Sequence, residues 1–512
     1  MMKSWLVSLA LLTQLGCTTT QSKSSKESTY HMEKVWYQGG MDNALKLSKA
    51  QNKPLFVYWG AVWCPPCNEI KDQVFSRSRF GELMGQFIPV YLDGDSEEAQ
   101  IWADRLQAYG YPTILVLSPE GKEMLRLSGG VNLEEFELAL AGAQNRSLDE
   151  LVEKARSGKL DREGWQAISF ISWGQLPEDQ YPAKTIWAIQ RDLLDSMPRG
   201  LQRERAVLIA DFLGLSSRLA QEESPVEGLD DVRREAPQLL DGVFSSEQTV
   251  LATRGFINSS GVDVLSWAFS SESSAYDSWK KRWLWAAQVI RSSKRVSVDT
   301  RLWAIYPLIQ FHKDEQPKKA APEALKAQVV AAAQQADLEA TSSYERHSVI
   351  SGAAYLMRLV EAYDQAERLL KKELAQTDTP WYYQSSLSSL AAAQDKDQEA
   401  LYWSAEARKS AQGRASRLQW ITSDLLLTAK VESQDQRERL LFLAKEFYQL
   451  ATDLKDGFAG RNQFRAARVG KSLQAWKNDK GFQSLFKGYQ SRCQNLSGVA
   501  QDNCIKHFEE LI

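Results

Sequence analysis

Two cysteines separated by two residues, placed where an apolar segment ends, constrain this chain more than any other feature. The segment covers residues 54–62, and Trp63-Cys64-Pro65-Pro66-Cys67 follows it directly. The apolar run predicts a buried strand. Pro65 suits the first turn of a helix, because its missing N–H would have no partner there and its φ is already helical. We therefore expect a dithiol at a strand-to-helix junction, where it can close into a disulfide and reopen.

This junction gives the two cysteines different roles. The first N–H groups of a helix have no intrahelical partner and the helix dipole is positive there, so a thiolate is favoured at Cys64. Thiolates at such positions in Cys-x-x-Cys motifs have pKa values lowered to roughly 3.5 to 7.5. We expect Cys64 to be the nucleophile. Cys67, one helical turn further and more enclosed, would attack the mixed disulfide and release the reduced substrate.

Residues 34–145 resemble a thioredoxin-fold domain, closest to the C-terminal domains of periplasmic thiol:disulfide interchange proteins and related thioredoxin-like lipoproteins. The resemblance rests on residues 53–57, on the cysteine motif with Lys71 and Phe75 downstream, and on residues 111–115. It implies a central mixed sheet flanked by helices and a thiol–disulfide oxidoreductase activity that needs no cofactor beyond the Cys64/Cys67 disulfide.

The same resemblance implies a cis peptide bond before Pro112, at the start of a strand beside the dithiol, where neighbouring backbone can pair with a substrate strand. Cis peptide bonds are nearly confined to X-Pro, so a proline is what this conformation requires. The residues expected to support the site are Trp63, Pro65, Pro66, Tyr111 and Pro112.

Hydrophobic periodicity predicts the remaining elements of this region. Residues 41–51 and 101–109 are expected to be helices and residues 87–92 a strand. Two short strands are expected at 113–117 and 123–127, with a turn between them. A last helix should start at Asn132, where Glu135 completes a capping pattern. The order β-α-β-α-β-β-α predicts a small sheet with helices on both faces.

One position departs from the pattern of the family. Thioredoxins usually carry a buried carboxylate five residues ahead of the motif tryptophan, which helps to deprotonate the second cysteine, and here that position is Tyr58. The nearest acid, Glu69, lies two residues past Cys67. A side chain that is simply exposed to solvent is an equally good interpretation of Glu69. The attack of Cys67 on the mixed disulfide is then either slow, or its proton transfer goes through water. A structural disulfide or a zinc half-site remains the alternative, although no histidine lies near Cys64 in the sequence.

The N-terminal residues predict export. Residues 1–17 have one charge at Lys3, an apolar stretch at 5–12, and a Leu-Gly-Cys ending, which is typical of a secretory signal. The ending resembles a bacterial lipoprotein signal, in which Cys17 becomes the lipidated first residue of the mature protein. Gln14 stands where such signals usually have leucine, so ordinary cleavage is the alternative.

Residues 18–33 are rich in Ser, Thr and Lys and predict a flexible tether. No other apolar run approaches the roughly 20 residues of a membrane-spanning helix, so we expect attachment to a membrane by lipid. The expected location is the periplasmic side of the bacterial cell envelope.

The other two of the five cysteines lie near the C-terminus. Cys493 and Cys504 flank a Leu-Ser-Gly turn, and in an oxidising compartment they predict a structural disulfide worth about 3 kcal/mol in the chain-entropy model. The alternative is a second redox pair, or an internal substrate of Cys64 and Cys67.

The chain beyond residue 145 reads as helix. Its apolar residues recur at spacings of three and four, proline is sparse, and 43% of the 512 residues are hydrophobic, which suffices for large cores. We divide it into a helical region at 146–340 and a region of helical hairpins at 341–512. A net charge of −3 gives no electrostatic case for binding nucleic acid.

Two segments of the second helical region repeat. Residues 363–370 are echoed by 397–403, which places Ala366 and Ala400 34 residues apart, a spacing that resembles the tetratricopeptide period. The 34-residue spacing does not continue, because the next equivalent position is occupied by Gln434. The interpretation is a stack of helical hairpins, a tetratricopeptide-like solenoid, with generic hairpins as the alternative.

Two classes of function follow. In the first, the chain is an envelope thiol:disulfide oxidoreductase, a reductase or isomerase acting on protein disulfides and supplied by a membrane electron-donor thiol protein, and its helical region recruits protein partners. In the second, it is a non-catalytic interaction or assembly lipoprotein with a thioredoxin-like module. The dithiol together with Pro112 favours the first, and Tyr58 favours the second. The Pro65-Pro66 pair does not fix the direction of electron flow.

Overall fold

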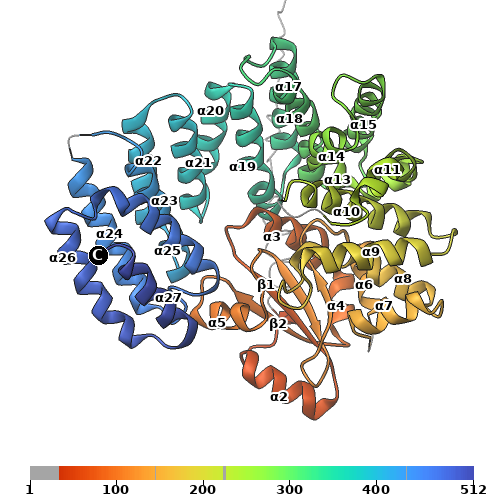
Figure 1. Ribbon diagram of the computed structural model, residues 1–512, viewed down its shortest axis with the longest axis horizontal. Helices are drawn as coiled ribbons and strands as arrows, with labels where there is room; N and C mark the ends of the chain where they lie inside the picture. The colour runs from red at the N-terminus through yellow and green to blue at the C-terminus, as the bar shows by residue number, and fades with distance from the viewer. Residues whose placement is uncertain (1–33, 144–145, 223–225, 434) are drawn as a thin grey trace, which may run out of the picture.

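The computed structural model describes residues 34–143, 146–222, 226–433 and 435–512. The expected signal at 1–17 with Cys17, the expected tether at 18–33, and Gln434 lie outside the described residues. A small α/β region at the N-terminal end is followed by a long series of helices that arcs around it (Figure 1). The expected fold class, a thioredoxin-like α/β region followed by an all-helical region, is confirmed.

The sheet places the strand that leads to the cysteines near its middle. Its order is β2-β1-β3-β4, with β1 parallel to β2 and antiparallel to β3, and with β3 antiparallel to β4. Every residue of β1 is buried. The last two strands begin and end at the predicted residues. The strands are β1 (Leu55–Gly60), β2 (Ile88–Asp93), β3 (Thr113–Leu117) and β4 (Glu123–Leu127).

Helices cover both faces of this sheet, as predicted. Because successive side chains of a strand point to opposite faces, Leu55, Val57 and Trp59 join one apolar cluster with α2 and α5, and Phe56 and Tyr58 join another with α3, α4 and α6. The helices of this region are α2 (Met41–Gln51), α3 (Pro65–Ile70), the π-helical segment η1 (Lys71–Phe75), α4 (Ser78–Met84), α5 (Glu97–Arg105) and α6 (Leu133–Gly142).

Local capping explains where the helix predictions succeeded and failed. Helix α6 begins after Asn132 with the predicted capping box to Glu135. The helix expected at 101–109 is wrong by about four residues, because the Ser96 side chain accepts the Ala99 N–H at 3.2 Å and starts α5 at Glu97. Helix α4 was not predicted. The cap at Ser96 therefore determines where α5 starts, whereas the prediction placed the start at the first apolar residue of the helical pattern.

The first part of the helical region packs directly on the α/β region. Helix α8 lies against α6. The elements are α7 (Leu148–Arg156), α8 (Arg162–Phe170), the 3-10 helix η2 (Trp173–Gln175), α9 (Ala183–Ser196), α10 (Gln202–Leu219), α11 (Leu229–Val243), α12 (Glu247–Ala252), α13 (Arg254–Ser259), α14 (Gly261–Ala268), α15 (Ser274–Ser292), α16 (Val298–Trp303), α17 (Tyr306–Glu315) and α18 (Glu323–Glu339).

The second part continues the arc in consecutively packed helices. The disulfide between Cys493 and Cys504 joins η4 to α27 near the C-terminus. The elements are α19 (Ser343–Leu359), α20 (Tyr363–Leu374), α21 (Pro380–Ala392), α22 (Asp397–Ser410), α23 (Arg414–Thr428), α24 (Gln436–Asp453), α25 (Gly460–Leu473), η3 (Gln474–Trp476), α26 (Lys480–Gln490), η4 (Ser491–Asn495) and α27 (Gly498–Glu509).

The repeat seen in the sequence has a structural counterpart. Ala366 on α20 and Ala400 on α22 are both fully buried. The turns before these helices hold Glu361 and Asp395 in the left-handed region, with φ of 60° and 55°. Since these two residues are also 34 positions apart, the two hairpins share one backbone pattern. The arrangement is compatible with a tetratricopeptide-like pair.

A buried ion pair holds the α/β region against the helices. Arg254 of α13 donates to both carboxylate oxygens of Glu135 in α6, at 2.8 and 2.6 Å. Burial alone would raise the pKa of Glu135, but the charge and hydrogen bonds of Arg254 outweigh it and lower that pKa below its ordinary value. The two regions are therefore joined by an ionised pair as well as by apolar packing.

Glu135→Gln should lower the free energy of unfolding by about 3 kcal/mol at neutral pH, because it leaves Arg254 buried without a counter-charge. Because the pKa of Glu135 is lower in the folded than in the unfolded chain, its ionisation stabilises the fold at pH values above the unfolded pKa. This stabilisation is lost as the pH falls through the folded pKa, so the stability difference between the native chain and Glu135→Gln should shrink in acid. Thermal midpoints measured against pH check this. Glu134→Gln removes the neighbouring, exposed carboxylate and should change stability by less than about 0.5 kcal/mol. An equal effect of both changes would contradict the role of the buried pair.

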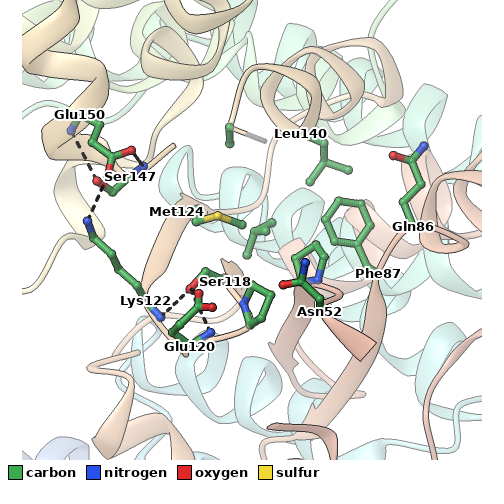
Figure 2. A pocket seen from close by; sticks show the side chains of 14 residues that line it. Asn52, Gln86, Phe87, Ser118, Glu120, Lys122, Met124, Leu140, Ser147 and Glu150 are labelled. Atoms are coloured by element: carbon green, nitrogen blue, oxygen red, sulfur yellow. Dashed lines mark hydrogen bonds and ion pairs between the residues drawn. The ribbon is translucent and has the colours of Figure 1, made fainter. Parts of the chain in front are cut away.

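A pocket of about 540 Å³ opens at the end of the sheet opposite the cysteines (Figure 2). Its charged side chains are engaged with neighbouring side chains and backbone. Lys122 pairs with Glu150 at 3.4 Å, and the Ser118 hydroxyl donates to Glu120 at 2.9 Å.

Within the described residues, no helix is both long enough and apolar enough to cross a membrane.

Candidate active site

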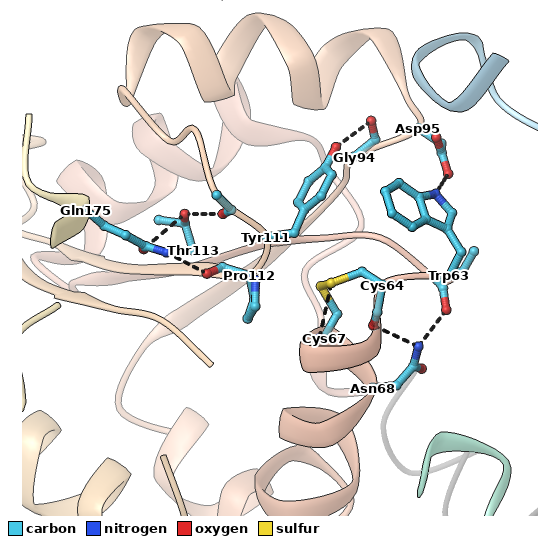
Figure 3. Close-up of a disulfide and its surroundings, with 12 residues drawn as sticks. Trp63, Cys64, Cys67, Asn68, Gly94, Asp95, Tyr111, Pro112, Thr113 and Gln175 are labelled. Carbon is cyan, nitrogen blue, oxygen red and sulfur yellow. Dashed lines mark hydrogen bonds between the residues drawn. A yellow bond between two sulfur atoms is a disulfide. The ribbon is translucent and has the colours of Figure 1, made fainter. Parts of the chain in front are cut away.

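Cys64 and Cys67 form a disulfide at the start of α3, with their Cα atoms 5.2 Å apart (Figure 3). Strand β1 ends at Gly60, and Cys64 is the N-cap of α3, as expected. The Cys67 backbone N–H donates to the Cys64 sulfur at 3.2 Å. The Cys64 sulfur thus lies where unpaired helical N–H groups favour negative charge. This is the geometry that an attacking or leaving thiolate requires.

Asn68 braces the turn that carries the motif. Its buried side-chain amide donates to the carbonyl oxygens of Val62 and Cys64, at 2.8 and 3.0 Å. These bonds span the residues that connect β1 to α3 and therefore fix the direction in which the helix leaves the strand. Sequence reasoning did not single out Asn68, because an asparagine in the first turns of a helix is common.

The second expected element of the site lies beside the disulfide. The Tyr111–Pro112 peptide bond is cis, and β3 begins at the next residue. A Cβ added to Gly129 would lie 3.2 Å from Pro66 and 3.3 Å from Pro112. Gly129 therefore lets the loop after β4 close against both prolines. The sequence analysis did not single out Gly129, although the Gly129-Gly130 pair, one residue after a predicted strand, was a usable indication.

Trp63 is held by an acid that the sequence analysis missed. The Trp63 indole N–H donates to Asp95 at 2.9 Å. The other carboxylate oxygen of Asp95 accepts the backbone N–H of Ser416 on α23 at 3.1 Å. Burial raises the pKa of Asp95, against the opposing effect of the hydrogen bonds from Ser416 and Trp63. One side chain thus links the motif to a helix more than 300 residues away.

The helical region closes over the dithiol. Cys64 is only 3% exposed and Cys67 is fully buried. They share an apolar cluster with Trp381 of α21 and Trp420 of α23, and Tyr382 stacks on Trp63 with ring centroids 6.0 Å apart. Because so little of Cys64 is accessible, a folded protein cannot reach its sulfur in this arrangement. Sequence periodicity could not reveal this long-range contact.

The other side of the site is covered in the same way. The Arg461 guanidinium on α25 lies 4.3 Å from the centre of the Tyr111 ring, next to the cis bond. The Tyr111 hydroxyl donates to the Gly94 carbonyl at 3.1 Å. The residues expected to support the site are therefore together, and Trp63 and Tyr111 both contact the helical region.

Tyr58 lies on β1, the strand that leads to the cysteines, and is neutral. It is buried, its ring stacks on that of Tyr91 with centroids 5.2 Å apart, and its hydroxyl has no hydrogen-bond partner among the described residues. Burial raises the pKa of Tyr58 well above its ordinary value, and the charge of Asp93 raises it further. Tyr58 therefore cannot accept a proton from Cys67 in the way that a carboxylate would.

Glu69 is not simply solvated, which corrects one reading of the sequence. Its carboxylate accepts hydrogen bonds from Ser297 at 2.6 Å and from Thr300 at 3.3 Å, at the start of α16. Burial raises the pKa of the neighbouring Asp299, and the charge of Glu69 raises it further. Glu69 is thus a contact between the motif helix and the helical region.

Lys71 occupies an apolar and aromatic environment on η1. Its Nζ lies 5.6 Å from the ring centre of Tyr91 and 5.8 Å from that of Tyr344. Burial lowers the pKa of Lys71 to about 8, although the charge of Asp93 opposes this. The folded protein therefore binds the Lys71 proton less tightly than the unfolded chain does.

Lys71→Met should raise the free energy of unfolding at pH 7 by on the order of 1 to 2 kcal/mol. With the folded pKa at about 8 and the unfolded value at 10.5, the stability of the native chain should increase as pH rises through that window. The variant should lack this increase. Thermal midpoints from pH 7 to pH 10.5 check it, with Lys49→Met as the exposed control. A destabilised Lys71→Met at pH 7 would contradict the assignment.

A metal site at the dithiol has no support in the described residues. Among them, no group of three or more His, Cys, Asp or Glu side chains is placed to hold a metal ion. The zinc alternative requires two ligands besides Cys64 and Cys67, and the described part of the chain brings none of them together with that pair.

Comparison with known proteins points to one family. A family model described as a thioredoxin-like domain matches residues 41–144. A thioredoxin H-type of Brassica oleracea and a thioredoxin H-type 1 of Brassica napus are each 31% identical over 100 residues, which cover 19% of this chain and 75% of each relative. The residues that the family model matches form the α/β region that carries the disulfide.

Proposed function

The chain belongs to the thioredoxin-like family through residues 41–144, and on this premise we propose that it is a thiol–disulfide oxidoreductase acting on protein disulfides. The observation that carries the proposal is the Cys64–Cys67 disulfide at the first turn of α3, beside the cis-proline segment. Family membership and the disulfide support a redox function. The choice of a reductase or isomerase and of protein substrates is our proposal.

The reaction exchanges two electrons through two cysteines. In the reduced form, the Cys64 thiolate attacks one sulfur of a substrate disulfide, forms a mixed disulfide and displaces one substrate thiolate. The Cys67 thiolate then attacks the Cys64 sulfur and displaces the second substrate thiolate, which leaves the Cys64–Cys67 disulfide. Each displaced thiolate takes up a proton. With Tyr58 neutral, the proton of Cys67 passes to water in this scheme.

A thiol donor must then reduce the disulfide again. We propose a membrane electron-donor thiol protein, with this chain anchored through lipid on Cys17 at the periplasmic side of a bacterial membrane. The support is the pattern of residues 1–17 in the sequence. No further cofactor and no nucleic acid enter this scheme.

The helical region is proposed to recruit protein partners and to control access. Its support is the cover over the site, in which α21, α23 and α25 contribute Tyr382, Trp420 and Arg461. A partner that binds these helices and draws them from Trp63 would expose Cys64. In that case the Cys64 sulfur becomes accessible only when a partner binds. The helical region then determines which proteins the small redox domain reacts with.

The reduction potential of the Cys64/Cys67 couple tests the proposed direction. Equilibration with glutathione buffers, followed by alkylation and mass spectrometry, measures it. A reductase or isomerase should give a value at or below roughly −180 mV. A value near roughly −120 mV, as in strong periplasmic oxidants, would contradict a reductase.

The second candidate is a non-catalytic interaction or assembly lipoprotein with a thioredoxin-like module. The 3% exposure of Cys64 and the neutral Tyr58 favour it. The two candidates differ in whether protein thiols exchange with the disulfide in the intact chain. If no protein thiol reduces it while dithiothreitol does so slowly, the second candidate stands.

A further inference from the structure

A buried lysine lies one helical turn beyond Cys67. The Lys71 backbone N–H donates to the Cys67 carbonyl, so the helix is continuous between the two residues. Side chains four positions apart on an α-helix are neighbours, with Cβ atoms about 5 to 6 Å apart, and a helical side chain leans toward the N-terminal end of its helix. The Lys71 side chain therefore starts out toward the turn that carries Cys67, and both residues are buried.

The Lys71 ammonium has no ion pair in the oxidised chain. Its Nζ lies over the rings of Tyr91 and Tyr344, and no carboxylate of the described residues forms an ion pair with it. Asp93 raises the pKa of Lys71 through its charge alone, and this effect is smaller than that of burial. Lysine is almost never buried without a partner, because removing an isolated ammonium from water is costly. The oxidised chain therefore holds a buried cation without a paired anion.

The other titratable groups around Lys71 do not supply this anion. Those that face it from β2 and α19 are Tyr91, Tyr344 and His347. Burial raises the pKa of Tyr91 and lowers that of His347, so both are neutral at neutral pH. The charged side chains of α4, α6 and the motif helix have partners of their own, which are Arg79 with Glu82 and Glu137, Glu134 with Arg203, Glu135 with Arg254, Glu69 with Ser297, and Asp72 with Ser342.

Reduction of the disulfide supplies an anion one turn away, because a cation beside a thiol favours its ionised form. We propose that, in the reduced chain, the Lys71 ammonium is the counter-charge of the Cys67 thiolate and so assists the second step of disulfide exchange. This assistance rests on the proposed oxidoreductase function. The ion pair itself does not, since it requires only that the disulfide be open.

The second step balances in protons and electrons. The proton of Cys67 passes to water, and the Lys71 ammonium stabilises the thiolate that remains. The thiolate then bonds to the Cys64 sulfur, the bond from Cys64 to the substrate sulfur breaks, and its electron pair leaves with the substrate thiolate. Lys71 is then again without an anion, as in the oxidised structure. Lys71 thus favours deprotonation of Cys67 by its charge, whereas the neutral Tyr58 cannot accept the proton.

The pKa of Cys67 in the intact Cys64→Ser chain tests the ion pair, because the Cys67 thiol is free there. Ultraviolet absorbance of the thiolate against pH measures it, with the Cys64→Ser/Cys67→Ser chain subtracted as the blank. Adding Lys71→Met should raise the pKa of Cys67 by about one unit or more. Lys49→Met, on the exposed face of α2, should leave it unchanged, and Lys71→Arg should largely preserve it because the charge is kept. A smaller rise in Lys71→Met, or an equal rise in Lys71→Arg, would overturn the proposal.

Single-turnover kinetics of the chain with both cysteines tests the assistance. With a disulfide-bonded peptide, Lys71→Met should form the mixed disulfide at the native rate. At a pH below the pKa of Cys67 it should resolve that disulfide about threefold more slowly, since a tenfold smaller thiolate fraction is partly offset by the stronger nucleophilicity of a thiolate of higher pKa. Equal rates of resolution would overturn the assistance. If the native chain exchanges with no disulfide while the pKa of Cys67 still rises in Lys71→Met, the oxidoreductase function is wrong and the ion pair is supported.

Discussion

Replacing Cys64 with serine should abolish disulfide exchange by the intact chain, lowering the rate at least ~1,000-fold. The hydroxyl cannot form the mixed disulfide, and Cys67, the other cysteine of the motif, is fully buried and cannot take over the attack. Cys67→Ser should differ, because it keeps the attacking sulfur. It should form the mixed disulfide and stop there, since the second attack on Cys64 is missing.

The rate of reduction of a disulfide-bonded peptide, with dithiothreitol as electron source, measures both effects. The matched control is the pair Cys493→Ser and Cys504→Ser, which removes the other disulfide at the far end of the chain. It should lose some stability and keep the exchange rate. If Cys64→Ser retained more than about a tenth of the native rate, the assignment of the nucleophile would be wrong.

Tyr382→Ala should speed the reaction of the Cys64–Cys67 disulfide with a folded thiol protein about tenfold. The Tyr382 ring lies on Trp63 and against Trp420, and it is only partly buried. Aromatic pairs contribute about 0.5 to 1.5 kcal/mol beyond their buried area. Since 1.4 kcal/mol corresponds to a tenfold change in an equilibrium constant, removing this ring should raise the population of the uncovered site by that factor.

The rate of disulfide reduction by a small thioredoxin-sized thiol protein, followed by alkylation of the freed cysteines, checks this prediction. Reduction by dithiothreitol should change less, because a small reagent needs a smaller opening. Tyr402→Ala, an exposed aromatic on α22, is the control and should leave both rates unchanged. Equal rates for the native chain and Tyr382→Ala would show that the helices do not restrict access.

Features determined by neighbouring residues could be predicted from the sequence. Strands β3 and β4, the capping box of Asn132 with Glu135, and the helix start at Cys64 all depend on short-range patterns of polarity, caps and prolines. The start of α5 was displaced because Ser96 caps a first turn of polar residues, which hydrophobic periodicity does not detect.

Features that depend on distant contacts could not be predicted. Asp95 orients Trp63 and binds the backbone of Ser416, and nothing around Asp95 in the sequence indicates either contact. The cover by Trp381 and Tyr382 likewise depends on how the helical arc curves back over the motif. The sequence allowed Glu69 to be interpreted as exposed to solvent, because nothing in it shows that Ser297, at the start of α16, lies beside Glu69. The position of the dithiol at a helix start was thus predictable, and its cover by the helices was not.

Trapping of partners on Cys64 tests the central claim most directly. In cells that produce the intact Cys67→Ala chain, mixed disulfides should accumulate on Cys64 and appear as larger species on non-reducing separation, each lost on reduction. The account predicts such species for Cys67→Ala and none for the Cys64→Ala/Cys67→Ala double variant. If no mixed disulfide forms while Cys64 of the trap variant is alkylated normally, the chain does not act as a thiol–disulfide oxidoreductase.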